Sequence, residues 1–415
     1  MRRNRFPLAA LIVTVCAASF TGCECGSSRV TAPPLPPLSA VVLTPPTDTL
    51  VLGATRRFTA AAFDTNNVAV AGAAFDWTSD DPSVITVSSS GLVTATGEGV
   101  TALIAAAGGK ADTAIVAVIV QPGWYVQTSA TINDLNGVFF RPDGRNGWAV
   151  GDAGTVVRTT DAGASWAAQA SGTSFNLNDV WFTTGATGFA VGHNGTVMRT
   201  RNGGTSWTRL TNTGTANNLF GVCFADTSNG WVVGANGTIL RTTNAGASWN
   251  KLNPTAQQLN SVSFSDTANG WAVGETGVIA GTHDAGRSWY VVQPAVTSLG
   301  VRAVWRLSNT RAIAGGGSGV NPNTTATADS LQWNLGSFGA ANQIDGLHMA
   351  DDLTGYAVGT NGSGLVLKTQ NGGASWAPQV APSAQALNDV WFVDALRGWA
   401  VGVGGRILHT SKGGL

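Results

Sequence analysis

The stretch that decides the fold runs from Gly147 to Trp166 and reads GWAVGDAGTVVRTTDAGASW. It holds two short apolar runs, WAV and TVV, and each run ends at a cluster of Gly, Asp or Thr. Short apolar runs separated by such turn-forming residues are typical of β-strands joined by tight turns. The phrase returns as GFAVGHNGTVMRTRNGGTSW from Gly188 and as GWVVGANGTILRTTNAGASW from Gly230. The chain is therefore predicted to be all-β and built from repeats.

The repeat has a regular period. The tryptophans that close the phrase stand at Trp166, Trp207, Trp249, Trp289, Trp333 and Trp376, with spacings of 41, 42, 40, 44 and 43 residues. Each unit opens with a run such as LNDVWF, and these openings begin at Leu135, Leu177, Leu219, Leu259, Leu299, Leu347 and Leu387. Four short strands in a period of this length match one blade of a β-propeller.

The two ends of the repeat array complement each other. Seven openings are present, but only six are followed by a strand that begins with Trp. The last copy, RILHTSKGGL, ends at Leu415 before any Trp, whereas Trp124 stands 42 residues before Trp166. We expect residues 124 to 128 to supply the missing outer strand and so to close a ring of seven blades, because closure removes the exposed edges of an open array. The fifth unit has lost the turn motif but keeps Trp333.

The turn TTDAGASW matches the Asp-box pattern, in which a Thr or Ser, an Asp or Asn, a Gly, a second hydroxyl and an aromatic follow in order. Its residues here are Thr159, Asp161, Gly163, Ser165 and Trp166. The later copies place Asn202, Asn244, Asp284 and Asn371 at the acidic position, each followed by the Trp of its unit. Because an amide cannot act as a general base, the exchange of Asp for Asn favours a structural role in the turn.

The N-terminus reads as a targeting segment. A basic start, MRRNR, precedes the apolar run FPLAALIVTVCAASF and then FTGC, which ends at Cys23. This arrangement resembles the lipobox of bacterial lipoproteins, which implies a signal peptide over residues 1–22 and lipidation of Cys23; an ordinary signal peptide is the alternative. Residues 23–37 are rich in proline and are expected to form a stiff linker.

Residues 38–120 form the first expected domain. The order LVLGATRRFTAAAF, WTSDDPSVITV and GLVTATGEGVTAL resembles the group 2 bacterial immunoglobulin-like domain. That resemblance implies a β-sandwich with Trp77 in its core and turns at Gly91, Gly97 and Gly99. It implies a spacer or adhesive module and no chemistry.

Composition excludes several classes of function. Charged residues make up only 11% of the chain and balance to zero, which argues against nucleic acid because its binding needs a basic face. The four Cys and four His are dispersed, so no metal or other cofactor is expected.

Two sets of residues remain as candidate binding positions. Asp152, His193 and Glu275 lie in the turns within each GWAVG phrase and are expected near the mouth of the central channel, unless they are ordinary solvated turn residues. A basic residue stands before the Asp-box turn in most units and is expected to form a rim on the opposite face, either for binding or as a solvated edge: Arg158, Arg199, Arg241 and Lys368, with His409 in the last unit.

The propeller, residues 123–415, resembles the photosystem II stability and assembly factor family, whose blades repeat the GWAVG phrase and the Asp-box. The resemblance implies a non-catalytic protein that binds a partner during the assembly of a membrane protein. For this chain we expect a protein or glycan partner, a monomeric state, and a lipid anchor that places it on the extracytoplasmic side of the bacterial envelope (the outer membrane or cell surface). The alternative is an Asp-box glycoside hydrolase of the sialidase or endoglucanase type. All three tyrosines occupy repeat positions and the mouth turns show no paired acids, so the sequence favours the non-catalytic interpretation.

Overall fold

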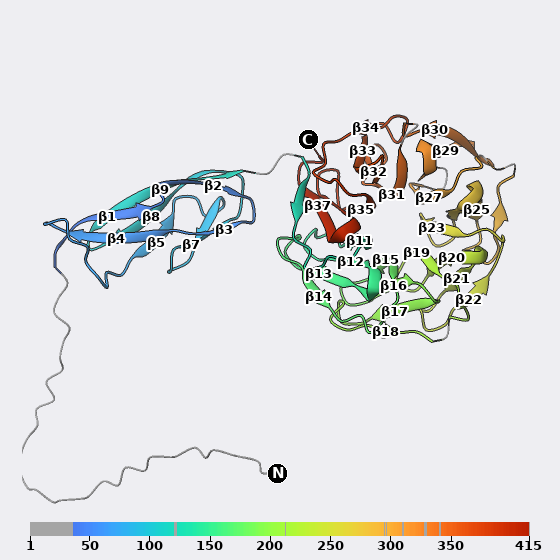
Figure 1. Cartoon of the computed structure of the whole chain (residues 1–415), viewed down its shortest axis with the longest axis horizontal. Helices are drawn as coiled ribbons and strands as arrows, with labels where there is room; N and C mark the ends of the chain where they lie inside the picture. The colour runs from blue at the N-terminus through green and yellow to red at the C-terminus, as the bar shows by residue number, and fades with distance from the viewer. Residues whose placement is uncertain are drawn as a thin grey trace, which may run out of the picture.

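The computed structural model describes residues 36–119 and 123–414, apart from residues 212, 294, 296, 309–310, 328–329 and 340–341. The predicted signal peptide, the lipidation site at Cys23 and most of the linker lie outside the described residues. The described chain forms two sets of β-sheets, one on each side of residues 120–122 (Figure 1).

The N-terminal set has three sheets. β2, β9, β8 and β5 form one, β3, β7 and β6 another, and β1 pairs with β4. The strands are β1 (Leu38–Thr44), β2 (Thr47–Val51), β3 (Thr55–Arg57), β4 (Thr59–Asp64), β5 (Asp76–Ser79), β6 (Ile85–Val87), β7 (Leu92–Ala95), β8 (Gly99–Ala107) and β9 (Lys110–Ile119). Phe58, which is 1% exposed, lies in the core, whereas Trp77 is only partly buried against it. Trp77 packs at the edge of this core, and its ring lies close to Gly91, where an added Cβ would lie 2.8 Å from it.

The second set is a ring of seven four-stranded antiparallel sheets, the blades of a propeller (Figure 1). Blades 1 to 3 comprise β11 (Leu135–Phe140), β12 (Gly147–Gly151), β13 (Val156–Thr159), β14 (Ala167–Gln169); β15 (Leu177–Phe182), β16 (Gly188–Gly192), β17 (Thr196–Thr200), β18 (Thr208–Arg209); and β19 (Leu219–Phe224), β20 (Gly230–Gly234), β21 (Ile239–Thr242), β22 (Asn250–Leu252).

Blades 4 to 7 follow the same plan. They comprise β23 (Leu259–Phe264), β24 (Gly270–Gly274), β25 (Ile279–Thr282), β26 (Tyr290–Val291); β27 (Val301–Arg306), β28 (Ala312–Gly316), β29 (Val320–Thr327), β30 (Ser330–Ser337); β31 (Gln343–Met349), β32 (Gly355–Thr360), β33 (Gly364–Thr369), β34 (Ala377–Pro378); and β35 (Leu387–Phe392), β36 (Gly398–Gly402), β37 (Arg406–Thr410) with β10 (Tyr125–Gln127).

The strand before the first opening completes the last blade. β10 pairs with β37, with Tyr125 opposite His409 and Gln127 opposite Ile407. Trp124 meets Phe392 edge to face at 5.7 Å, the same centroid distance as between Trp166 and Phe140 in blade 1. Trp124 therefore takes the place of the missing seventh Trp, and the ring closes between the two ends of the array.

Two of the predicted openings are displaced. Blade 5 begins at Val301, which is fully buried, and not at Leu299, which is 40% exposed. In blade 6 the first strand begins at Gln343, and the residue equivalent to Leu135 is Ile344, which pairs with Gly359 as Leu135 pairs with Gly151. Leu347 lies three residues further along this strand, opposite Ala357. The residue at the position equivalent to Leu135 must be buried. The pairing register of the strand therefore determines which residue takes it, and the nearest leucine in the sequence need not be that residue.

Neighbouring blades are held together by aromatic stacking. At five of the seven boundaries, the second strand of a blade places a ring on the Phe that ends the first strand of the next blade. Trp148 stacks on Phe182 at 3.6 Å, and Trp231 on Phe264 at 3.4 Å. All four of these side chains are at least 90% buried. Burial of large aromatic rings in this geometry is a major source of stability for the ring.

The hydrogen bonds in the Asp-box show why Asp and Asn can replace each other there. Asp161 accepts hydrogen bonds from the Ser165 backbone N–H (2.9 Å) and hydroxyl (2.6 Å). In the copy with Asn202, the backbone bond from Ser206 remains (3.0 Å), but the amide now donates to the Ser206 hydroxyl (2.9 Å). The hydroxyl can either donate or accept, so carboxylate and amide hold the same turn.

Candidate functional site

The predicted basic rim forms contacts between blades. Arg199 Nη1 donates to the Ala245 carbonyl (3.3 Å), Arg241 Nε to the Ala285 carbonyl (2.7 Å) and Lys368 Nζ to the Gly413 carbonyl (2.9 Å). Each acceptor lies in the Asp-box turn, or its equivalent in blade 7, of the next blade. The fourth member, Arg158, lies over the Trp148 ring at 5.7 Å.

The fifth basic position is also internal. His409 is 6% exposed, stacks on Trp399 at 4.5 Å and places Nδ1 2.9 Å from the Gly398 carbonyl oxygen. Burial lowers the pKa of His409 to about 4. The expectation of an exposed rim is corrected for Lys368 and His409, which are buried: Lys368 reaches into the next blade, and His409 packs within its own.

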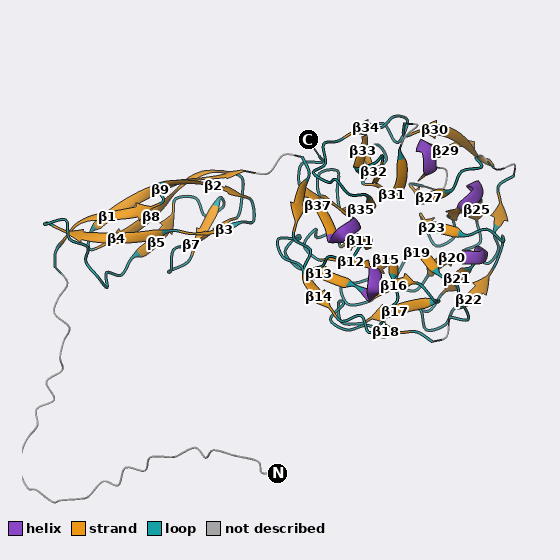
Figure 2. Ribbon diagram, viewed as in Figure 1, coloured by secondary structure: helices purple, strands orange, loops and turns teal. Residues whose placement is uncertain are grey.

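Each of the three candidate mouth residues begins a short turn between the second and third strands of its blade. Two of these turns are short helices, η1 (Asp152–Gly154) and η3 (Glu275–Gly277), which lie at different places around the ring (Figure 2). Asp152 accepts a hydrogen bond from the Asn136 amide and Glu275 one from the Asn260 amide, each at 3.0 Å. His193 is partly buried. None of the three lines the central cavity, and Asp152 and Glu275 are each held by a different asparagine that does.

A ring of asparagines at the second position of the inner strands joins the blades. The side-chain amide of each donates to the first carbonyl of the next inner strand: Asn136 to Leu177 (3.1 Å), Asn178 to Leu219 (2.6 Å), Asn260 to Val301 (3.0 Å) and Asn388 to Leu135 (2.9 Å). The Asn388 bond crosses from blade 7 to blade 1 and so helps to close the ring.

Two carboxylates face the cavity one layer below this ring. Asp179 accepts the Val222 N–H (2.8 Å) and Asp389 the Val138 N–H (2.9 Å), so each also joins its blade to the next. Gly137 makes room between them, since an added Cβ there would lie 2.8 Å from the Asp179 Cα. Burial raises the pKa of both carboxyl groups, and the charge of Asp389 raises that of Asp179 further.

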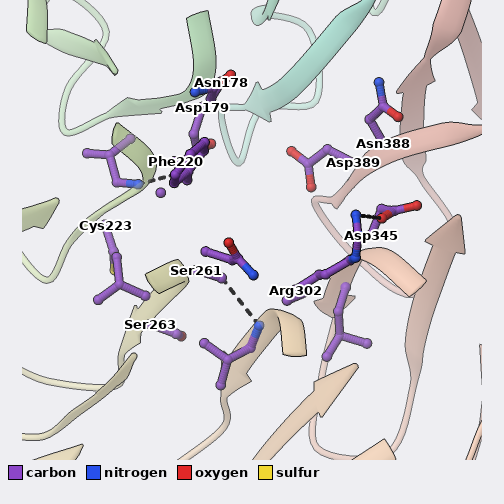
Figure 3. A pocket seen from close by; sticks show the side chains of 18 of the residues that line it. Asn178, Asp179, Phe220, Cys223, Ser261, Ser263, Arg302, Asp345, Asn388 and Asp389 are labelled. Atoms are coloured by element: carbon purple, nitrogen blue, oxygen red, sulfur yellow. Dashed lines mark hydrogen bonds and ion pairs between the residues drawn. The ribbon is translucent and has the colours of Figure 1, made fainter. Parts of the chain in front are cut away.

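The ring is interrupted in three blades: the second position is Phe220 in blade 3 and carries charge in blades 5 and 6. Arg302 Nη1 lies 3.0 Å from Asp345 Oδ1, and the two side chains are 43% and 15% exposed. Figure 3 shows this pair on one side of the cavity and the small side chains of Cys223 and Ser263 on the other. The mouth therefore presents both charge signs within a ring of amides.

Aromatic side chains form the floor. Trp391 contacts Phe139 (4.5 Å), Trp181 (5.4 Å) and His348 (4.6 Å), and His348 packs on Trp305 (4.0 Å). The cavity above them has a volume of about 120 Å³. Burial raises the pKa of the Cys223 thiol to about 12 and lowers that of His348 to about 3, so both are neutral at pH 7. The opening in the ring of ribbons is thus closed by side chains.

Sequence reasoning missed Asp179 and Asp389 as cavity residues. One feature of the sequence could have identified them: only two of the seven openings, at Leu177 and Leu387, carry Asp at the third position. Within the described residues no group of three or more His, Cys, Asp and Glu is arranged to hold a metal ion. No helix in that part of the chain is long and apolar enough to cross a membrane.

The comparisons with known proteins point to one kind of propeller. Residues 118–213 and 204–297 match the family described as photosynthesis system II assembly factor YCF48. A search of curated proteins finds no match. The structure of YCF48 from Cyanidioschyzon merolae is similar, with 20% identity and a TM-score of 0.58 over 69% of this chain and 98% of that one.

Other solved structures share the ring. A structure of YCF48 bound to D1 peptide matches with 20% identity and a TM-score of 0.59, covering 71% of this chain and 98% of that one. The β-propeller domain of Doa1 matches at 12% identity and a TM-score of 0.56, covering 70% and 98%. At these identities the structures establish the fold. The chain thus carries a β-propeller like that of the YCF48 structures, and residues 118–297 also match the family model.

Proposed function

We propose that this chain is a non-catalytic binding protein of the bacterial cell envelope, anchored through lipid on Cys23, whose propeller binds a segment of a partner protein at the mouth of the central cavity. Residues 38–120 would act as an immunoglobulin-like spacer between the anchor and the propeller. The similarity to a YCF48 structure that contains a D1 peptide supports a polypeptide partner over a glycan.

The observation that carries the proposal is the shape of the cavity. Its floor is closed by Trp181, Trp391 and their neighbours, so a ligand can enter only at the mouth. A volume of about 120 Å³ is well below the ~300–1,000 Å³ of pockets that enclose a small molecule. The cavity can therefore receive one side chain of a larger partner lying across the asparagine ring.

The same geometry weighs against the glycoside hydrolase alternative. Asp179 and Asp389 are cavity carboxylates close enough for the charge of one to raise the pKa of the other, but each already accepts a backbone N–H from the next blade. A cavity of this size leaves no room for a sugar ring together with an attacking water. Both acids therefore serve to hold the ring together.

Site-specific crosslinking tests which face binds. A photo-crosslinking side chain is placed at Ala153 in the mouth turn, and the matched control is Ala164 in the Asp-box turn of the same blade; both are exposed. In native membranes we expect a protein adduct from position 153 and none from 164. Equal adducts from both positions, or from 164 alone, would refute the mouth as the binding face. Binding to glycans without any protein adduct would favour a glycan partner.

The anchor is tested separately. Cys23→Ser should move the protein from the membrane to the soluble fraction, and a palmitate analogue should label only the wild type. A wild type that sediments with membranes but takes up no label would show that lipid on Cys23 is not the anchor.

A further inference from the structure

A pocket at the outer edge of the propeller, between blades 3 and 4, gathers positive charge. It has a volume of about 360 Å³ and is lined by Arg241, Asn250, Lys251, Leu252, Gly286 and Arg287. We call it the cationic pocket. It is separate from the cavity mouth, so a ligand bound here is independent of the partner proposed for the mouth.

The positive charge of this pocket is offset only in part, by the charge of the neighbouring carboxylate of Asp284. Among the residues that the structure describes, none of Arg241, Lys251 and Arg287 forms an ion pair. The nearby acidic group, Asp284, is engaged in its own Asp-box through the Ser288 N–H (3.0 Å), the Ser288 hydroxyl (2.7 Å) and the Thr282 hydroxyl (2.9 Å). Three formal positive charges thus line one pocket.

Arg241 is held in place for binding. Its Nε donates to the Ala285 carbonyl (2.7 Å), and it lies directly across the strand pair from the buried Trp231. That bond uses the Nε edge and leaves the two terminal nitrogens for a ligand. Burial and the nearby charge of Arg287 lower the pKa of Arg241, while Asp284 opposes that shift; an anion in the pocket would relieve the repulsion between the two guanidinium groups.

Sister blades show that packing does not require this charge. Lys251 occupies the position of Ala168 in blade 1, since each faces the middle of the third strand. Arg287 occupies the Asp-box position held by Ala164, Thr205, Ala247 and Ala374 in the other blades. The equivalent place between blades 1 and 2 therefore has one cation, Arg158, where this pocket has three.

We propose that the cationic pocket binds a phosphate group. The planar guanidinium matches the oxygens of a phosphate, and two further cations balance a dianion. Asn250 adds an amide donor to the lining. The phosphate could belong to a free ion or ester, or to the headgroup of a phospholipid, and the chemistry of recognition is the same for both.

The test uses the full chain with Cys23→Ser, so that no lipid anchor contributes. Inorganic phosphate is titrated at constant ionic strength by calorimetry, and binding to phosphatidylglycerol vesicles is compared with binding to phosphatidylcholine vesicles. The pocket variant is Lys251→Ala with Arg287→Ala, which introduces residues that sister blades carry. The control, Lys110→Ala with Arg145→Ala, removes the same charge from exposed positions elsewhere.

We expect saturable phosphate binding that weakens about tenfold or more in the pocket variant and is unchanged in the control. Binding only to phosphatidylglycerol, lost in the pocket variant alone, would support the proposal with a lipid headgroup as the source. Absence of both kinds of binding, or equal losses in the two variants, would overturn it. Thermal unfolding without phosphate should be the same for all three proteins, which separates a binding defect from a folding defect.

Discussion

The boundary between blades 3 and 4 and the boundary between blades 4 and 5 have the same strand plan but different chemistry. At the first, Trp231 stacks on Phe264 at 3.4 Å. At the second, Arg306 stands where Phe is expected, and it is 4% exposed. Its Nε donates to the Ser265 hydroxyl (2.8 Å) and its N–H to the Ser263 hydroxyl (2.9 Å). Each boundary of the ring must be filled, but an aromatic stack and a hydrogen-bonded guanidinium can both fill it.

The loss of the Asp-box in blade 5 is accompanied by changes in blade 4. Regular boxes are held by the preceding blade: the Ala285 carbonyl accepts from both Trp231 Nε1 (3.0 Å) and Arg241. Blade 5 has a long hairpin of β29 and β30 in place of the box. In blade 4, Gly281 occupies the position of Arg241, and Trp271 Nε1 has no hydrogen-bond partner among the described residues. Where the box is missing, its acceptor carbonyl and the arginine donor are both absent, while the Trp271 ring remains.

Exchanging the residues of the two boundaries should have unequal effects. Phe264→Arg should lower the free energy of unfolding by about 4 kcal/mol or more, because Ala225 stands where Ser265 supports Arg306 and the charge would be buried without a partner. The reverse change, Arg306→Phe, should alter it by about 1 kcal/mol or less. Urea unfolding measures both. Equal costs would show that the boundaries are not chemically distinct.

The closing strand and the fifth blade can be compared through their outer tryptophans. Trp124→Ala should cost about 3–5 kcal/mol, because the ring packs against both Tyr356 and Phe392 and anchors the strand that closes the propeller. Trp333→Ala should cost less, since its aromatic contact is with Trp271. Thermal and urea unfolding of both variants decide the order. A larger loss for Trp333 would contradict the importance assigned to closure.

The buried His348 in the floor of the cavity should make the free energy of unfolding depend on pH. Burial lowers the pKa of His348 to about 3, below the ~6.5 of an unfolded chain. The unfolded state therefore binds the proton first, so the stability due to neutral His348 is complete above pH ~6.5 and is lost progressively as the pH falls toward its folded pKa.

His348→Phe should reduce the loss of stability between pH 7 and pH 4 by on the order of 2 kcal/mol. Asp179 and Asp389 titrate with the opposite sign, but they are present in both proteins and cancel in the comparison. His193→Ala serves as the control, because that side chain is only partly buried and lies in a mouth turn. Parallel pH curves for wild type and His348→Phe would contradict the prediction.

The sequence predicts those features of the fold that depend on local repetition. The spacing of Trp166 and its sisters indicates the blades, and Trp124 one period earlier indicates the closing strand. It cannot predict what depends on the direction of a side chain in the assembled ring. Arg199 and Arg241 resemble face residues in the sequence, because a strand position does not reveal that the side chain reaches the next blade. Asp179 and Asp389 look like repeat residues until the ring brings blades 2 and 7 to either side of Gly137.

The smallest expected change in stability concerns the hydrogen bond between Trp231 and the Asp-box of the next blade. Trp231→Phe removes the bond from Nε1 to the Ala285 carbonyl, whereas Trp271→Phe removes no hydrogen bond to the described residues, and the two side chains lose the same volume. Arg241 still donates to the Ala285 carbonyl in the first variant, so the carbonyl is not left unpaired. We therefore expect Trp231→Phe to cost about 1 kcal/mol more than Trp271→Phe in urea unfolding. Combining Trp231→Phe with Arg241→Ala should then cost more than the sum of the single changes, because the carbonyl loses its last side-chain donor. Additive costs would mean that the two donors act independently and that the box is held chiefly by its own turn.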